Sequence, residues 1–303
     1  MTDCIKCFSI WAILKNVVFI VVCVVLLCFA ASAKAITWTT LDYPGVNGTC
    51  ITGMDGNIIV GRWKGAMNNR SFSYDGTTWA EFSFPGSSGT RVEGIVGGKI
   101  FGSYSVPDLP THGFVYDGTS WTTLDFPGAS STSIYDIDGG NIVGNKNTSG
   151  GFLYDGTTWT TLNCPYGGLS IYGIDGDNLV GSAGFDHSVI YNLESKAWTI
   201  FDFPEASSTI AYDIDGSNIV GYYYVSGFEH GFIYDGTAWA TLDFPGASYT
   251  RIYGIEGDNI FGKYEDSSGD GHGFIATIPE PCTVLLLGLG GVLLRNRRAN
   301  KKF

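Results

Sequence analysis

The segment HGFIATI, from His272 to Ile278, begins like the segment HGFIYDGTAWATLDFPG, from His230 to Gly246, but departs from it after four matching residues. The missing half stands at the other end of the repeats, where residues 36–45 read ITWTTLDYPG. Together the two pieces make one complete hairpin. A chain that divides one hairpin between its two ends can close a ring by pairing them, whereas an open solenoid needs atypical capping repeats.

Between these pieces the chain repeats one unit of about 40 residues six times. Each unit has a tryptophan, a proline six residues later, and then a motif such as YGIDGDN. The tryptophans are Trp38, Trp79, Trp121, Trp159, Trp198 and Trp239. Asp-Gly turns separate short β-rich runs within a unit, and this is the strongest local signal of a β-hairpin. Four-stranded units of this length are typical of propeller blades.

We therefore predict an all-β fold, a six-bladed β-propeller over residues 36–278, closed by pairing of its N-terminal strand with its C-terminal strand. The TRIYGI-like strands are expected innermost and the tryptophan strands outermost. The Pro-Gly segments then cross from the rim of one blade to the hub of the next. The units also resemble a bacterial extracellular repeat family named for a His-Ala-Phe motif (HAF-like repeats), with His-Gly-Phe in its place, and the resemblance implies an exported repeat protein.

Residues 1–35 have the pattern of a secretory signal peptide. Lys6 and Lys15 precede an apolar run, VVFIVVCVVLLCFAA, and small-residue sites after it predict cleavage at Ala33 or Ala35. The expected partners are the export machinery and signal peptidase. The alternative is a retained membrane anchor, although the run of 15 apolar residues is shorter than the roughly 20 that a spanning helix needs.

Residues 279–303 have the pattern of a sorting tail. The motif Pro279-Glu280-Pro281 precedes an apolar segment, residues 282–294, which predicts a short transmembrane helix. Thirteen helical residues rise only about 20 Å against a hydrocarbon core of about 30 Å, so a permanent span is disfavoured. The basic residues at the end are expected on the cytoplasmic side. They include Arg295, Arg297, Arg298, Lys301 and Lys302.

This tail resembles the PEP-CTERM sorting signal of exported proteins in Gram-negative bacteria. The resemblance covers residues 279–303 and implies processing near Pro281 by an exosortase, a membrane transpeptidase-like enzyme whose gene often lies beside exopolysaccharide genes. It implies an inner-membrane intermediate, followed by release or attachment in the cell envelope, at the cell surface or in the extracellular matrix. It implies nothing about the activity of the repeats.

Residues 36–278 contain 9 Lys and Arg against 27 Asp and Glu, a net charge of about −18. Because nucleic-acid phosphates are bound by neutralising cations, no nucleic-acid partner is expected. Two cysteines, Cys50 and Cys164, lie in this range and give no disulfide framework. Cys164 replaces the phenylalanine of the DFPG motif, which predicts a buried apolar thiol.

The histidines do not predict a metal centre. All four share one repeat position, and equivalent positions around a ring do not converge; they are His112, His187, His230 and His272. We expect them to cap loops or to pack on a neighbouring blade, and we predict no metal and no cofactor. Turns such as IDGDN contain acids like those of calcium loops, but DIDGGN and DIDGSN lack the later bidentate acid. Hairpin turns explain them, with calcium as the alternative.

The tryptophans fit two roles, as packing residues or as stacking platforms for sugars, one per blade. Residues that break the repeat are the better candidates for function. The loops between second and third strands vary most, and we expect them to share one face with the interblade crossings. We predict binding at this face, by Trp63, Lys64, Arg70, Asp186, Tyr222, Tyr223, Glu229 and Asp266.

These residues form no recognisable nucleophile–base–acid arrangement, and the chain has no G-x-S-x-G, H-E-x-x-H or phosphate-loop motif. We therefore predict a non-catalytic protein of the cell surface or extracellular matrix that contacts exopolysaccharide or another envelope component. The alternatives are a propeller lectin with defined sugar pockets and a glycan-acting hydrolase with dispersed acids on one face.

Overall fold

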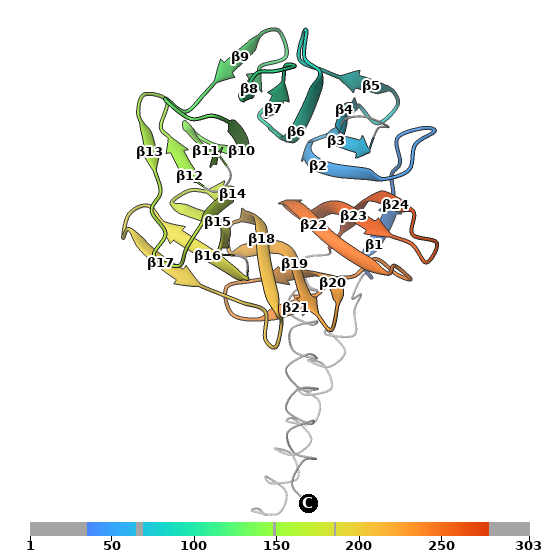
Figure 1. Ribbon diagram of the computed structural model, residues 1–303. Coiled ribbons are helices and arrows are strands. Elements are labelled where there is room, and N and C mark those ends of the chain that lie inside the picture. Colours follow the sequence, from blue (N-terminus) through green and yellow to red (C-terminus); the bar gives the residue numbers. More distant parts are fainter. Residues whose placement is uncertain (1–34, 65–68, 148–149, 185, 279–303) are drawn as a thin grey trace, which may run out of the picture.

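The computed structural model describes residues 35–64, 69–147, 150–184 and 186–278. The regular structure in these ranges is entirely β, and six antiparallel sheets of four strands surround a central axis (Figure 1). The prediction of a six-bladed β-propeller is confirmed. The described ranges contain no helix that is long and apolar enough to cross a membrane. The sorting tail, and the signal peptide up to residue 34, lie outside the described residues.

We number the blades 1 to 6 from β2, so that blade 6 combines β22, β23, β24 and β1. The innermost strands are β2 (Thr49–Asp55), β6 (Gly89–Val96), β10 (Thr132–Asp138), β14 (Leu169–Asp175), β18 (Ser208–Asp215) and β22 (Tyr249–Glu256). The second strands are β3 (Ile58–Lys64), β7 (Lys99–Ser105), β11 (Asn141–Lys146), β15 (Asn178–Ala183), β19 (Asn218–Val225) and β23 (Asn259–Glu265).

The third strands are β4 (Asn69–Tyr74), β8 (Thr111–Tyr116), β12 (Gly151–Tyr154), β16 (His187–Asn192), β20 (Phe228–Tyr234) and β24 (Gly271–Thr277). The outermost strands are β5 (Trp79–Phe82), β9 (Trp121–Leu124), β13 (Trp159–Thr161), β17 (Ala197–Ile200), β21 (Trp239–Thr241) and β1 (Thr37–Thr40). The TRIYGI-like strands are thus innermost and the tryptophan strands outermost, as predicted.

Pairing of two distant segments closes the ring. β1 pairs antiparallel with β24 along its whole length, from Thr37 opposite Thr277 to Thr40 opposite Phe274. The first described strand is therefore the rim of the last blade (Figure 1). The divided hairpin of the sequence is confirmed as the closure of the propeller.

An aromatic side chain on each of several crossing segments joins two neighbouring blades. Phe84 leaves blade 1 and stacks on Tyr104 of blade 2 with 3.7 Å between ring centroids, and Trp121 meets it edge-to-face at 5.0 Å. We call this set an aromatic clamp. Its stacked pair recurs as Tyr43–Trp63, Phe203–Tyr223 and Phe244–Tyr264. Burial of these rings and their mutual contacts stabilise the blade junctions.

Two blades fill the clamp with other side chains. In blade 3, Lys146 takes the tyrosine position and places its ammonium 3.7 Å from the centroid of the Phe126 ring. In blade 4, Cys164 and Ala183 take the two positions and pack with Trp198 in one hydrophobic cluster. Cys164, predicted to be buried, is half-buried there as a free thiol. A small residue on one side of the clamp is thus matched by a small residue on the other.

The outer tryptophans pack inward against the blades. Each is half-buried. In five blades the indole contacts the phenylalanine of the adjacent third strand. Trp79, for example, lies 5.1 Å from Phe72 between centroids. This arrangement favours packing over a row of exposed sugar platforms.

Each of the four histidines joins the third strand of a blade to the segment that follows its outermost strand. Each imidazole Nδ1 lies 2.7 or 2.8 Å from an aspartate that follows the outermost strand. The pairs are His112–Asp125, His187–Asp202, His230–Asp243 and His272–Asp42. The second carboxylate oxygen accepts the backbone N–H of the residue after the histidine. These contacts give the histidines a structural role. Within the described ranges no three His, Cys, Asp or Glu side chains are grouped to hold a metal ion.

The clamp makes a prediction about stability. Phe244→Ala should lower the free energy of unfolding by about 2–4 kcal/mol, because it leaves a cavity between Tyr264 and Trp38. Urea denaturation of residues 36–278 measures the change. Tyr166→Ala is the control: this ring is 42% exposed, so its loss should change stability by less than about 0.5 kcal/mol. Equal effects of the two substitutions would contradict the role of the clamp.

Candidate functional site

A β-bulge in every innermost strand directs one extra side chain toward the hub. In β10 the register with β11 shifts between Ile134 and Asp136, so Tyr135 has no partner on β11. The same shift occurs in all six blades. The bulged residues are Thr52, Glu93, Tyr135, Tyr172, Tyr212 and Tyr253. Because a bulge interrupts the alternation of faces, Tyr135 and Asp136 both line the central cavity.

The four bulged tyrosines form a chain of ring contacts in the hub. The centroids are 5.1 Å apart for Tyr135 and Tyr172, and 4.7 Å apart for Tyr172 and Tyr212. Tyr253 then meets Tyr212 edge-to-face at 4.8 Å. These rings border two hollows, with volumes of about 260 and 20 Å³. The tyrosine rings therefore separate a larger hollow at one end of the hub from a smaller hollow at the other end.

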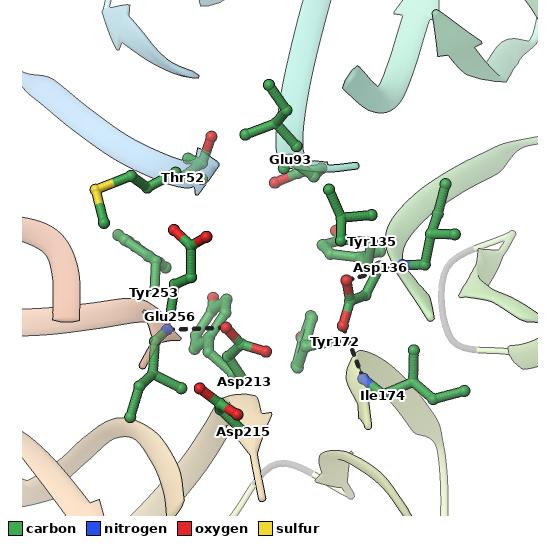
Figure 2. A pocket seen from close by; sticks show the side chains of 18 of the residues that line it. Thr52, Glu93, Tyr135, Asp136, Tyr172, Ile174, Asp213, Asp215, Tyr253 and Glu256 are labelled. Carbon is green, nitrogen blue, oxygen red and sulfur yellow. Dashed lines mark hydrogen bonds between the residues drawn. The ribbon is translucent and has the colours of Figure 1, made fainter. Parts of the chain in front are cut away.

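The larger hollow, which we call the hub cavity, is acidic. It occupies the end of the hub where the innermost strands reach their hairpin turns, and its lining contains eight carboxylates and no lysine or arginine among the described residues (Figure 2). The eight are Asp55, Glu93, Asp136, Asp138, Asp175, Asp213, Asp215 and Glu256. Such a cavity favours ligands that donate hydrogen bonds or carry positive charge.

The acids at the hairpin turns also join neighbouring blades. Asp175 Oδ2 accepts the backbone N–H of Gly216 in the next blade at 2.7 Å. Asp55, Asp138 and Asp215 each accept the N–H of a turn glycine in the next blade, from Gly98, Gly176 and Gly257, at 2.7 or 2.8 Å. These bonds explain the repeated Asp-Gly turns without calcium. Glu256 likewise has a backbone hydrogen bond from Gly56 of the next blade, but its Oε2 is buried without a hydrogen-bond partner among the described residues.

Two of the eight carboxylates, Asp136 and Asp213, occupy a position where four blades have glycine. Asp136 accepts the N–H groups of Ile137 and Ile174, and Asp213 those of Ile214 and Ile255, at 2.8 or 2.9 Å. Burial, followed by the charge of Asp213, raises the pKa of Asp136 well above its usual range. Burial raises the pKa of Asp213 to about 7 despite its two N–H donors, with the nearby Asp215 and Asp175 acting in the same direction. Asp213 is therefore partly protonated near neutral pH.

The structure does not gather the eight predicted binding residues into one site. Trp63 and Tyr223 are buried clamp residues. Arg70 forms an exposed ion pair with Glu81 on the outer half of blade 1. Asp266 accepts the N–H groups of Ser268 and Asp270 in its own loop and lies 3.7 Å from His272 Nε2. Asp186 is exposed, and its carbonyl accepts the N–H of Thr209. The side chain of Lys64 lies outside the described residues.

Two of the eight do meet. Tyr222 and Glu229 both contact Arg251, Glu229 through an ion pair and Tyr222 through its ring face, 4.7 Å from the guanidinium carbon. This contact lies at the end of the hub opposite the acidic cavity, since Arg251 precedes the bulged Tyr253 by two residues.

Sequence reasoning missed the hub residues. The signal was present, because the motif before each Asp-Gly turn holds tyrosine in four units and Thr52 or Glu93 in the others. A repeated acid looks like a turn residue, however, and the sequence does not reveal the bulge that places Tyr135 beside Asp136.

Comparisons with known proteins find no matching family model and no matching curated protein. Among solved structures, a virginiamycin B lyase from Staphylococcus aureus is 12% identical over 81% of this chain and 100% of its own, with a TM-score of 0.46. The Aleuria aurantia lectin in complex with Fucα1-6GlcNAc is 15% identical over 78% and 93%, with a TM-score of 0.47. BamB from Moraxella catarrhalis is 12% identical over 75% and 85%, with a TM-score of 0.39. At such values the likeness says nothing about the ligand of this chain.

The raised pKa of Asp213 predicts a pH-dependent stability. Between its unfolded pKa near 4 and its folded pKa of about 7 the folded state binds more protons, so stability falls as the pH rises through this window. In Asp213→Gly the fall in Tm from pH 5 to pH 8 should be smaller by roughly 5 °C. Thermal melts across this range measure it. Asp177→Gly, in an exposed hairpin, should keep the original profile, and an unchanged profile in Asp213→Gly would contradict the assignment.

Proposed function

We propose that this protein is a non-catalytic carbohydrate-binding propeller that holds one sugar unit of an extracellular polysaccharide in the hub cavity. The observation that carries the proposal is the composition of that cavity, where four tyrosines and eight carboxylates line about 260 Å³. Sugar hydroxyls donate hydrogen bonds to carboxylates, and sugar C–H faces pack against aromatic rings. Few other neutral ligands use both kinds of group at once.

The size and position of the cavity limit the ligand. A volume of about 260 Å³ is small for a ligand pocket and suits one ring of a saccharide rather than several. The cavity lies on the axis, at the end with the hairpin turns, and not in the variable loops between second and third strands. The proposed site is therefore a single central one and not one site per blade.

A glycan-acting hydrolase is the second candidate, and the pKa of Asp213 favours it. A carboxyl group with a pKa of about 7 suits a general acid, and other carboxylates line the same cavity. The competing explanation is structural, since both oxygens of Asp213 accept backbone N–H groups. Release of reducing ends that is lost in Asp213→Asn, with saccharide binding retained, would establish the hydrolase instead of the binding protein.

We propose export and surface attachment on the basis of the two terminal segments. The signal-peptide pattern of residues 1–35 and the PEP-CTERM-like pattern of residues 279–303 support this destination. The partners would be the export machinery, signal peptidase and an exosortase. The expected change is a loss of mass at each terminus, which mass spectrometry of protein from the host's surface measures.

The proposed binding of a sugar in the hub cavity predicts that the charge of Glu256 contributes to the affinity. Glu256→Gln keeps the shape of the side chain and removes the charge at a buried oxygen without a described partner. We expect this variant of residues 36–278 to bind neutral oligosaccharides from the host's extracellular polysaccharide about tenfold more weakly than the parent, because hydrogen bonds to charged groups are among the stronger ones. Isothermal titration calorimetry measures the difference.

The matched control is Glu194→Gln, in the exposed hairpin between β16 and β17, which should bind like the parent. The titration is repeated with a chelator, and loss of binding there would favour the calcium alternative. Absence of saturable binding by the parent protein would refute the proposed function and direct attention to a protein partner.

A further inference from the structure

The end of the hub opposite the acidic cavity collects positive charge. Residues 36–278 contain only 9 Lys and Arg, yet four of them meet here. They are Arg62, Arg91, Arg251 and Lys263. Arg91 and Arg251 each precede a bulged residue by two positions, so they lie on the hub side of their strands. We call this group the cationic sector.

Two of the four cations share one carboxylate. Arg62 and Arg91 both form ion pairs with Glu93, whose side chain is 6% exposed. The Arg62 side chain is 12% exposed and that of Arg91 is 40% exposed. One carboxylate neutralises one guanidinium, so this trio keeps a positive charge, and Arg91 can present it to a ligand from solvent.

The other two cations share the second carboxylate. Arg251 pairs with Glu229, and its guanidinium also lies over the Tyr222 ring. Lys263 is half-buried, places its ammonium 5.3 Å from the centroid of the Tyr249 ring, and has no ion pair among the described residues. The four cations of the cationic sector and the two carboxylates paired with them, Glu93 and Glu229, therefore carry two positive charges in excess. Burial, followed by the charge of Arg251, lowers the pKa of Lys263, as expected where positive charge is uncompensated.

This excess of positive charge destabilises the fold when no ligand is bound. Unpaired charges held away from water destabilise a fold, and because residues 36–278 contain three times as many acids as bases, a carboxylate partner for Lys263 would be easy to provide. Other blades hold Ser103, Asn145 or Ser182 at the position of Lys263 and Arg62, so the fold does not require a cation there. An anionic ligand would supply the missing charge.

We propose that the cationic sector is a second binding site, which takes the carboxylate of an acidic sugar between Lys263, Arg91 and Arg62. A guanidinium presents its N–H donors in a planar fork that fits a carboxylate, and a lysine adds a point charge. The need for an anion rests on the charges of this site alone. The choice of a sugar acid, over a free carboxylate or phosphate, rests on the carbohydrate role proposed above.

The test uses the full chain and galacturonate as the probe, with galactose as the matched sugar without a carboxylate. Isothermal titration calorimetry at low salt should show saturable galacturonate binding that Lys263→Gln weakens about tenfold or more. Lys196→Gln removes a lysine from an exposed hairpin and should leave the affinity unchanged. Thermal melts verify that both variants are folded, and Arg91→Gln, which leaves Glu93 paired with Arg62, should also weaken binding.

Three outcomes would overturn the proposal. The first is no galacturonate binding by the parent chain, or binding that Lys263→Gln and Arg91→Gln do not change. The second is equal affinity for acetate or inorganic phosphate, which would mark a site for free anions. The third is loss of galacturonate binding in Glu256→Gln, which would place the sugar acid in the hub cavity. Failure of neutral saccharides to bind, with galacturonate binding intact, would refute only the function proposed for the hub cavity.

Discussion

The contact on which the rest of the structure depends is the insertion of an aromatic side chain from one blade into the next. Phe84 between Tyr104 and Trp121 shows the arrangement. Where one member changes, the other is adjusted, as Lys146 covers Phe126 and Ala183 accompanies Cys164. These clamps set the spacing of neighbouring blades near the rim, and the turn aspartates set it at the hub, where each binds the glycine N–H of the next blade.

With the blades fixed in this way, equivalent residues of the innermost strands meet on the axis, and small differences between repeats decide the chemistry there. Tyrosines at four bulges separate an acidic end from a cationic end. The acidic end arises because the turn acid is repeated and because Asp136 and Asp213 replace glycine. The cationic end arises because two repeat positions each hold a cation in two blades, Arg91 and Arg251 at one and Arg62 and Lys263 at the other. The six blades are thus nearly alike, whereas the side chains at the two ends of the central axis differ in charge.

The sequence alone predicts the six-bladed ring, but it does not predict which side chains line the hub. Residues 36–45 and the segment that ends at Ile278 revealed the divided hairpin, because both halves keep their motif. In the sequence Trp63 and Tyr223 look like exceptions to the repeat, but in the structure they occupy the clamp position that Tyr104 and Tyr264 also hold. An alternating pattern places Tyr135 and Asp136 on opposite faces, and only the bulge brings both to the axis. Of the predicted residues, Tyr222 and Glu229 did converge, on Arg251.

The register of β1 with β24 has a topographical consequence. Thr37 stands opposite Thr277, so the chain enters and leaves the disc at neighbouring points on one blade. That point lies at the level of the hairpin turns, since Thr277 also pairs with Asn259 beside the turn that follows Glu256. If the C-terminal segment is held at a surface, the acidic end of the axis is directed toward that surface and the cationic end away from it. Blade 6 would then be the point of attachment, and the disc would have one face near the surface and one face away from it.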